Sequence, residues 1–331
     1  MINTLKSRRT AVVTLIITCS FYVILFHSDQ PRSLQSASDV KSPNIDLNIS
    51  REKTLAPSSE IKRGIRRNCV KLGISTKWSF YESPPPTHLL AQKSTRIAYG
   101  ANAKAGSSSF KHFLYLTEGD VGTTQLHFPD ENGKFPHWTP VKNNNFFGSE
   151  AELGTYVKIV PIRNPITRLV SAFRDKQLIK FMFLKKEEVI GLSDIKVFVR
   201  FVERLFVRSG LDGIISKEEH LQPQWENLEI CTFPYDIIMP MEHPEQYITV
   251  IQELSNTMHI PFPRKKPGSL LRGTTSDNRS TVDFAKEYFS SLSSVQRKAV
   301  LDHYKNDFEV FGYTKVYERG FPELKIFAEQ S

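Results

Sequence analysis

The chain has 331 residues, of which 40% are hydrophobic and 24% are charged, so its composition is that of a globular protein rather than of a disordered one. Its 16 glycines and 19 prolines exclude a collagen-like chain, and its three cysteines are too few for a disulfide-rich scaffold. No cysteines or histidines have the spacing of a structural zinc site. The net charge of +9 indicates a polyanionic partner, whether nucleic acid, anionic lipid, a nucleotide or a sulfated glycan.

Three basic residues precede an uncharged apolar segment at positions 10–26. The segment is at the short limit for a membrane-spanning helix, which needs about 17–25 residues, but it is longer than the core of a typical signal peptide. No small-x-small cleavage site follows it, which favours an uncleaved anchor. A cleaved signal peptide and a buried core helix are the alternatives. Because a basic flank stays in the cytoplasm, we predict a type II membrane protein with a cytoplasmic tail at 1–9, a transmembrane signal anchor at 10–27 and a lumenal remainder.

A lumenal address changes the interpretation of several residues. Asn48 and Asn278 each begin an Asn-x-Ser sequence, which makes them candidate glycosylation sites at the surface. Cys69 and Cys231 are the only cysteines outside the predicted span, and an oxidising compartment favours a disulfide between them. Two buried free thiols are the alternative, because the sequence does not give the distance between the two Cα atoms.

The rest of the chain divides by composition. Residues 28–90 are predicted to form a stem, because the first half of this range is rich in Ser, Pro, Asp and Lys and lacks apolar periodicity. Within it, the basic segment Lys62–Lys71 is interpreted as a solvated helix face. Residues 91–320 alternate strand, loop and helix patterns, which predicts one α/β domain, and residues 321–331 form a C-terminal tail.

A first strand–loop–helix unit spans residues 96–116. Its apolar start is typical of a strand, and the small residues that follow let a backbone wrap closely around an anion. Lys104 adds a positive charge to this loop, and Ser107–Ser109 supply an N-cap and hydroxyl donors. The lysine precedes Gly106, whereas the lysine of a Walker A loop follows its glycine, so hydrolysis of ATP or GTP is disfavoured. A plain structural turn is the alternative.

The second unit is more informative. Residues 156–162 have the pattern of a strand, in which Pro161 marks the strand end or an edge position. Asn164 is a good N-cap for the helix that follows, and Pro165 is a good first helical residue. Arg163 lies between the strand end and the helix N-terminus, where a guanidinium can hold a phosphate with two parallel hydrogen bonds. One apolar helical stripe is formed by Ile166, Leu169, Val170 and Phe173.

These two units resemble the two cofactor-binding motifs of the Golgi carbohydrate sulfotransferases, above all the group with chondroitin, dermatan and N-acetylgalactosamine 4-O-sulfotransferases. The second motif, residues 161–176, carries most of the resemblance, in the run Arg-x-Pro-x-x-Arg-Leu-Val-Ser-Ala-Phe-Arg-Asp-Lys. The first, residues 104–111, departs from the family pattern at the preceding Ala103 and in its serine run. Further matches lie at residues 219–224 (with Leu221 in place of Trp), 231–242 and 304–313.

The resemblance implies an α/β protein with a P-loop-like sulfotransferase fold, in which helices flank a central, mostly parallel sheet, and a location in the Golgi membrane. It implies transfer of a sulfonyl group from 3′-phosphoadenosine 5′-phosphosulfate (PAPS) to a glycan hydroxyl, most closely that of a chondroitin- or dermatan-type N-acetylgalactosamine, without a metal. The partners implied are an acidic glycan or glycosaminoglycan acceptor and the membrane, with no nucleic acid.

By the same resemblance, Lys104 acts on the leaving oxygen, while Arg163 and Ser171 hold the 3′-phosphate of PAPS. Arg168 and Arg174 either assist there or are solvated helix residues. The other residues assigned to PAPS binding are Gly106, Ser107, Ser108 and Ser109.

The acceptor hydroxyl needs a group that takes its proton near neutral pH, and this favours a histidine. His220 is the candidate base, because it falls in a block that resembles His-x-x-Pro-Gln of the family. Glu219 is the rival base, and a role of His220 in orienting the substrate or in packing is the alternative. Asp236 and Glu242 match family positions at which we expect structural roles.

Three other classes of protein fit parts of the sequence. A nucleotide kinase fits the strand–loop–helix units, but not the position of the lysine or the lumenal address. A catalytically inactive, membrane-tethered relative that binds a glycan or a nucleotide fits the departures from the family motifs. A nucleic-acid-binding protein fits the net charge but conflicts with the anchor and the glycosylation sequences. The sequence leaves the oligomeric state open.

Overall fold

A computed structural model describes residues 56–86, 88–93, 95–106, 110, 139–141, 146–175, 184–208, 218–242, 244–257 and 281–313. All of them belong to one compact unit. Among the described helices, none is long and apolar enough to cross a membrane. The predictions that lie outside the described residues are the anchor with its flanking tail, the C-terminal tail, the glycosylation sites Asn48 and Asn278, and the serines Ser107, Ser108 and Ser109.

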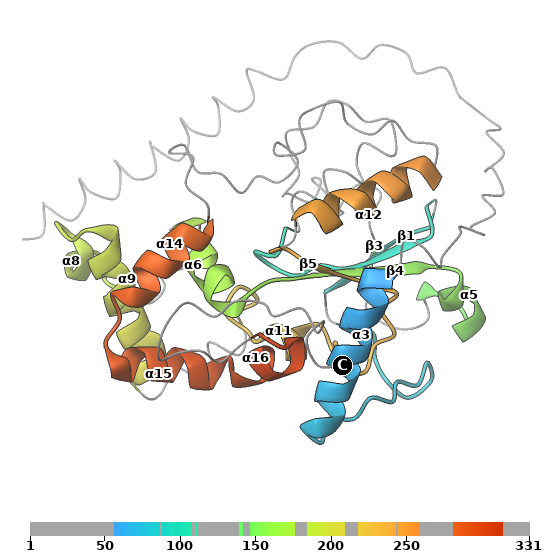
Figure 1. Cartoon of the computed structure of the whole chain (residues 1–331), viewed down its shortest axis with the longest axis horizontal. Coiled ribbons are helices and arrows are strands. Elements are labelled where there is room, and N and C mark those ends of the chain that lie inside the picture. Colours follow the sequence, from blue (N-terminus) through green and yellow to red (C-terminus); the bar gives the residue numbers. More distant parts are fainter. Residues whose placement is uncertain are drawn as a thin grey trace, which may run out of the picture. The chain divides into compact units, whose positions relative to one another are not determined.

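In the described part of the chain, five strands form one mixed sheet in the order β3–β1–β2–β4–β5 (Figure 1). Strands β2 (Ile97–Gly100), β4 (Val157–Ile162) and β5 (Ile237–Pro240) are parallel to one another. Strands β2 and β4 are those of the first and second strand–loop–helix units predicted from the sequence. Strand β1 (Leu89–Gln92) pairs antiparallel with β2, and strand β3 (Thr139–Pro140) pairs antiparallel with β1 at the edge of the sheet. Four of the five described strands thus run in one direction and β1 alone runs against them, because the short link between β1 and β2 permits only an antiparallel pair.

Helices cover both faces of this sheet. Val157 and Ile159 of β4 pack with Ile251 of helix α12 on one face, whereas Val160 and Ile162 pack into the larger core on the other. Figure 1 shows α12 (Pro244–Thr257) on one side of the sheet and α3 (Ala56–Lys71) with α16 (Lys305–Phe311) on the opposite side. All six residues of β4 are buried, as expected for a strand that is covered on both faces, and five of them are apolar, with Lys158 as the exception.

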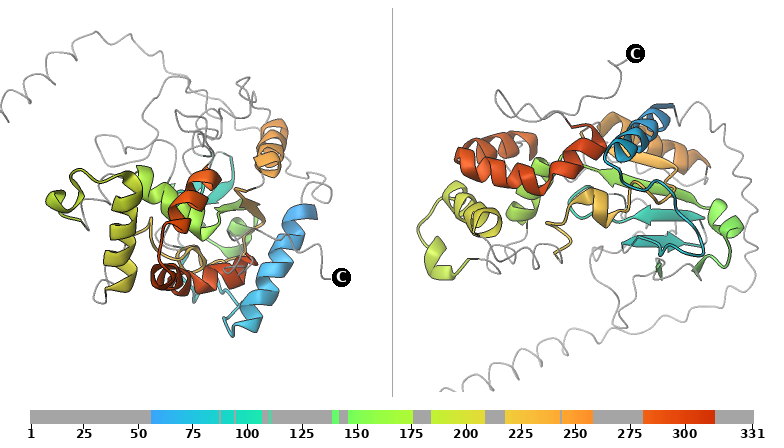
Figure 2. Two further views of the ribbon diagram at one scale, coloured as in Figure 1. Left: turned by 60° about the vertical axis from the view of Figure 1, so that its left-hand side comes forward. Right: turned by 90° about the horizontal axis from the view of Figure 1, so that it is seen from below.

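Helix α6 follows the end of β4, and α8, α9, α14 and α15 lie together beside the sheet (Figure 2). The apolar stripe predicted for the helix after β4 is fully buried, and this helix, α6, packs against α14. Pro161 lies one residue before the end of the central strand β4, so of its two predicted positions it takes the strand end. The bounds are α5 Glu150–Gly154, α6 Pro165–Asp175, α8 Lys186–Val189, α9 Asp194–Val202, the π-helical turn η2 Glu203–Val207, α11 Gln224–Asn227, α14 Thr281–Ser290 and α15 Ser294–His303.

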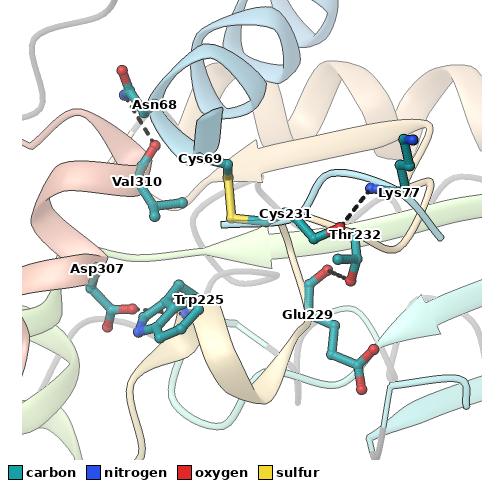
Figure 3. The surroundings of a disulfide bond; sticks show 10 residues. Asn68, Cys69, Lys77, Trp225, Glu229, Cys231, Thr232, Asp307 and Val310 are labelled. Carbon is teal, nitrogen blue, oxygen red and sulfur yellow. Dashed lines mark hydrogen bonds between the residues drawn. A yellow bond between two sulfur atoms is a disulfide. The ribbon is translucent and has the colours of Figure 1, made fainter. Parts of the chain in front are cut away.

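Helix α3 extends the folded unit upstream of residue 91, into the predicted stem. Ile61, Ile65 and Cys69 recur every four residues on its buried side. A disulfide joins Cys69 to Cys231, with 5.8 Å between their Cα atoms, so of the two expected states of these cysteines the structure has the bridge (Figure 3). Residues 56–86 and 88–90 fall within the predicted stem, but they belong to the folded unit, because the apolar side of α3 is buried in its core.

Candidate active site

The candidate residues gather where the three parallel strands end. The carboxyl ends of parallel strands lie at one edge of a sheet, which is where α/β proteins bind their ligands. Residues 101–106, with Lys104, follow β2; Arg163 follows β4; and Glu242 follows β5. A fourth segment, residues 218–224, carries His220. It is joined to this edge by hydrogen bonds from Gln224 to Asn102 and to Arg163.

The backbone of the Lys104 loop has an uncommon conformation. Lys104 has a φ of 65° and Gly106 a φ of 77°. A left-handed conformation costs about 1–2 kcal/mol for a residue with a side chain, so other contacts must hold it. A Cβ atom on Gly106 would lie 2.5 Å from Cε of Met241, so that Met241 would have to move, and the positive φ of Gly106 would itself strain any residue with a side chain. The loop thus has one fixed shape around the half-buried Lys104.

Two arginines hold this loop through its carbonyl groups. Nη1 of Arg163 donates to the Lys104 carbonyl oxygen at 2.7 Å. Nε of Arg168 donates to the Ala103 carbonyl oxygen at 2.8 Å. Two consecutive carbonyls of the loop therefore receive charge-assisted hydrogen bonds, which are about twice as strong as neutral ones.

The backbone of Arg163 is held by the side chain of Gln224. Oε1 of Gln224 accepts from the Arg163 amide at 3.0 Å, and Nε2 of Gln224 donates to the Arg163 carbonyl at 2.6 Å. Burial lowers the pKa of the Arg163 guanidinium, while the nearby Glu242 raises it. A guanidinium nevertheless stays charged, so Arg163 keeps a positive charge beside the Lys104 loop.

Asn102 connects β2 and β4 at the same edge. Its Nδ2 donates to the Pro161 carbonyl at 3.0 Å and to Oε1 of Gln224 at 2.7 Å. Its Oδ1 is buried and accepts no hydrogen bond within the described residues. A buried acceptor without a donor costs about 1–3 kcal/mol, which the two hydrogen bonds donated by Nδ2 must offset.

The start of α6 is capped as the sequence predicts. Oδ1 of Asn164 accepts from the amides of Ile166 and Thr167 at 2.9 and 3.3 Å. The Asn164 amide donates to Oε1 of Glu242 at 2.6 Å, and the Tyr313 hydroxyl donates to Oε2 of Glu242 at 3.1 Å. Burial raises the pKa of Glu242, and the Asn164 amide and Arg163 lower it. These contacts give Glu242 a structural role.

Arg168 is fully buried and donates to backbone carbonyls of two segments. It is 0% exposed, so the prediction of a solvated helix residue is wrong for it. Nη1 donates to the Gln222 carbonyl at 2.7 Å and Nη2 to the Glu219 carbonyl at 2.6 Å, in addition to the Nε bond to Ala103. One buried guanidinium thus joins the Lys104 loop to the segment that carries His220.

His220 forms its closest contact with a carboxylate that the sequence analysis did not single out. Nδ1 of His220 lies 2.5 Å from Oε1 of Glu218, but 3.8 Å from Oε1 of Glu219. Oε2 of Glu219 instead lies 3.6 Å from Nδ1 of His88. A carboxylate on Nδ1 fixes the tautomer and the ring orientation, and leaves Nε2 as the nitrogen that can take a proton. No described residue hydrogen-bonds to Nε2.

The C-terminal helices and the disulfide hold this segment from behind. The Tyr304 hydroxyl donates to the Leu221 carbonyl at 2.8 Å. The Asp307 carboxylate accepts from the amides of Gln224 and Trp225 at 2.9 and 2.8 Å, and burial raises the pKa of Asp307 to about 6 (Figure 3). Sequence reasoning missed these links, because each joins segments about 80 residues apart.

The other predicted residues lie outside these contacts. Ser171 is half-buried on α6, two turns beyond Arg163, and no described residue joins it to the Lys104 loop. The Arg174 guanidinium lies 3.3 Å from the ring centroid of Phe284, so it packs on α14 instead of facing solvent. Asp236 pairs with Lys158 at 2.6 Å and thereby ties β5 to β4, which is a structural role.

The fold and the site define an α/β protein that gathers two cations and a histidine–carboxylate pair at the carboxyl ends of parallel strands, as proteins for phosphate-bearing ligands do. Residues 87–314 match the model of the sulfotransferase family. The chain belongs to this family.

Named relatives agree with this assignment. The chain is 24% identical over 281 residues to carbohydrate sulfotransferase 8 of Mus musculus, covering 78% of this chain and 64% of that protein. It is 25% identical over 284 residues to the Homo sapiens protein of that name (78% and 63%), and 24% identical over 290 residues to Homo sapiens carbohydrate sulfotransferase 9 (80% and 61%). The matched part therefore spans less than two thirds of each relative. No solved structure matches the chain.

Proposed function

We propose that the protein is a PAPS-dependent carbohydrate O-sulfotransferase that acts in the Golgi lumen from a type II membrane anchor at residues 10–27. The acceptor is an N-acetylgalactosamine hydroxyl of a chondroitin- or dermatan-type glycan. One observation carries the proposal: the buried Arg168 joins the loop of Lys104 to the segment of His220, so a cation and a base share one edge of the sheet. Family membership and the names of the relatives support the same reaction class.

The residues at this edge fit a ligand that carries two phosphate groups. Lys104 and Arg163 place two positive charges beside the turn at Gly106, which suits the negative charge of the phosphate groups. Lys104, with Ser107–Ser109 of the same loop, would hold the 5′ side, and Arg163 with Ser171 the 3′-phosphate. When bound, PAPS supplies the sulfonyl group that is transferred to the sugar oxygen.

Each residue then has a defined task in the transfer. Lys104 offsets the negative charge that develops on the leaving phosphate oxygen. His220 takes the proton of the attacking hydroxyl on Nε2, and Glu218 holds the imidazole in the orientation that this requires. Arg168 keeps the two loops in register, which matters because misplacement by about 1 Å can cost about a hundredfold in rate.

The experiment is label transfer from radiolabelled PAPS by the full chain, offered a panel of desulfated chondroitin, dermatan, heparan and N-glycan acceptors. We expect transfer to chondroitin or dermatan, and its loss in Lys104→Ala, with a Lys286→Ala variant on α14 as the control. Arg163→Ala should weaken PAPS binding by about 1.5–3 kcal/mol, the value of one charge-assisted contact. Unchanged PAPS affinity in Arg163→Ala would contradict the assignment of the 3′-phosphate.

The adjacent residues Glu218 and Glu219 provide a matched pair of variants that tests how the base is oriented. Glu218→Ala should lower kcat about 10–100-fold and leave PAPS affinity unchanged, because it removes only the group that orients His220. Glu219→Ala, one residue away, should keep kcat. The reverse result would make Glu219 the base. PAPS binding without transfer to any acceptor would identify an inactive binding protein instead.

A further inference from the structure

Helix α3 has a basic outer face that the proposed reaction does not use. All five of its basic residues are exposed, and Glu60 is its only acidic residue. At about 100° per residue, these five positions cover about half of the helix circumference, opposite the buried stripe, and they extend over about 14 Å of the axis. We call this surface the basic face; its residues are Lys62, Arg63, Arg66, Arg67 and Lys71.

Nothing in the described fold neutralises these charges. None of the five forms an ion pair with a described residue, whereas other exposed cations do, such as Arg96 with Glu152 and Lys298 with Asp302. Like charges four residues apart, such as Arg63 and Arg67, destabilise a helix. The basic face therefore costs stability in the isolated fold, and an external anion would remove that cost.

The helix is not built to lie in a membrane surface. An interfacial helix inserts an apolar side into the lipid, but the apolar side of α3 is already buried in the core. The disulfide at Cys69 and the bond from Asn68 Nδ2 to the Val310 carbonyl at 3.2 Å fix that orientation. Val70 is the one large apolar residue that α3 exposes among those described. A soluble polyanion fits this face better than an anionic lipid surface.

We propose that the basic face binds an acidic polysaccharide. We further propose that this polysaccharide is the one that carries the acceptor hydroxyl, and this second part rests on the proposed function. Three of the five cations of the basic face are arginines, whose planar guanidinium pairs with a carboxylate through two parallel hydrogen bonds. The disulfide connects α3 to Cys231, in the chain segment that continues from His220 through α11 (Figure 3). A polysaccharide held along α3 is thus held by an element that is covalently fixed to the catalytic segment.

The test compares two triple variants of the full chain. Arg63→Gln, Arg66→Gln and Arg67→Gln together neutralise the basic face. Lys196→Gln, Lys286→Gln and Lys298→Gln remove the same charge from α9, α14 and α15. The probe is fluorescently labelled desulfated chondroitin polymer, and its binding is measured by anisotropy at low and high salt.

For the α3 triple variant we expect about tenfold weaker polymer binding at low salt, with a smaller difference at high salt. The KM for the polymeric acceptor should rise by a similar factor, while kcat and the KM for a short neutral N-acetylgalactosaminide stay unchanged. The control triple variant should bind the polymer like the wild type.

Equal polymer affinity of the α3 variant and the wild type would overturn the proposal. An equal loss of polymer binding in the control variant would also overturn it, because the effect would then depend on the net charge of the protein and not on the basic face. If the α3 triple variant lost binding to phosphatidylserine vesicles but kept its binding to the polymer, the partner of the basic face would be a membrane surface, and the proposal would be overturned. Anisotropy needs no turnover, so an absence of sulfonyl transfer would refute the proposed function without deciding this proposal.

Discussion

Arg168 permits the sharpest test of how the site is assembled. Its guanidinium is 0% exposed and donates to three carbonyls, those of Ala103, Glu219 and Gln222, on two loops that the sequence separates by more than 100 residues. Arg168→Lys keeps the positive charge but replaces a planar fork of donors by one compact ammonium. The substitution therefore tests the geometry of the link separately from its charge.

The structure sets the expected magnitude. An ammonium at this place can serve one of the two loops, so at least one buried carbonyl loses its donor, at a cost of about 1–3 kcal/mol. A domain of this size loses about 2–4 °C in Tm per kcal/mol, so the variant should remain folded with a Tm lowered by about 2–12 °C. Because the link sets the position of Lys104 against His220, kcat should fall about tenfold to a hundredfold.

Thermal unfolding followed by circular dichroism measures the first quantity, and single-turnover transfer measures the second. Arg297→Lys, on the surface helix α15, is the matched control and should change neither. A double-mutant cycle with Lys104→Ala then separates positioning from general loosening. If Arg168 acts through Lys104, the two losses in rate will not multiply. A folded Arg168→Lys variant with unchanged kcat, or losses that multiply fully, would refute the reasoning.

Two further predictions concern stability. The bridge between Cys69 and Cys231 closes a sequence separation of 162 residues, so Cys69→Ser with Cys231→Ser should lower the free energy of unfolding by up to about 5 kcal/mol. Chemical denaturation with and without a reductant checks this, and an equal response of wild type and variant to the reductant would contradict it. Burial raises the pKa of Asp307 from 3.8 to about 6, so the folded state binds more protons than the unfolded state between these values. The free energy of unfolding should therefore fall by about 2 kcal/mol as the pH rises from about 4 to 6, and this dependence should be absent in Asp307→Asn.

Local patterns predicted the parts of the fold that local forces determine. The two parallel strands β2 and β4, and the capped, striped helix α6, follow from residue types a few positions apart. The apolar stripe of α3 also has helical period, but five cations surround it, and such a composition is equally typical of a solvated helix. Strand β3 has only two residues, Thr139 and Pro140, which is too short for any periodicity to indicate.

The hydrogen bonds that organise the site were not accessible in this way. Gln224 contacts Asn102, Arg163 and Asp307, which lie 122, 61 and 83 residues away in the sequence. No local signal distinguishes such a residue from any other glutamine, because its partners come together only when the sheet forms. Glu218 was missed for a different reason: it is one of two adjacent glutamates, and only the turn of the backbone decides which one faces His220.

The same reasoning explains why a departure from the family pattern at Leu221 need not disturb the site. The side chain of Leu221 is fully buried in the core, where an apolar residue of another size is accommodated by packing. Its carbonyl, by contrast, accepts from the Tyr304 hydroxyl, and the neighbouring Gln222 carbonyl accepts from Arg168. Both contacts use the backbone and are independent of the side chain at position 221. The position of the His220 segment is therefore set by groups that this substitution leaves in place.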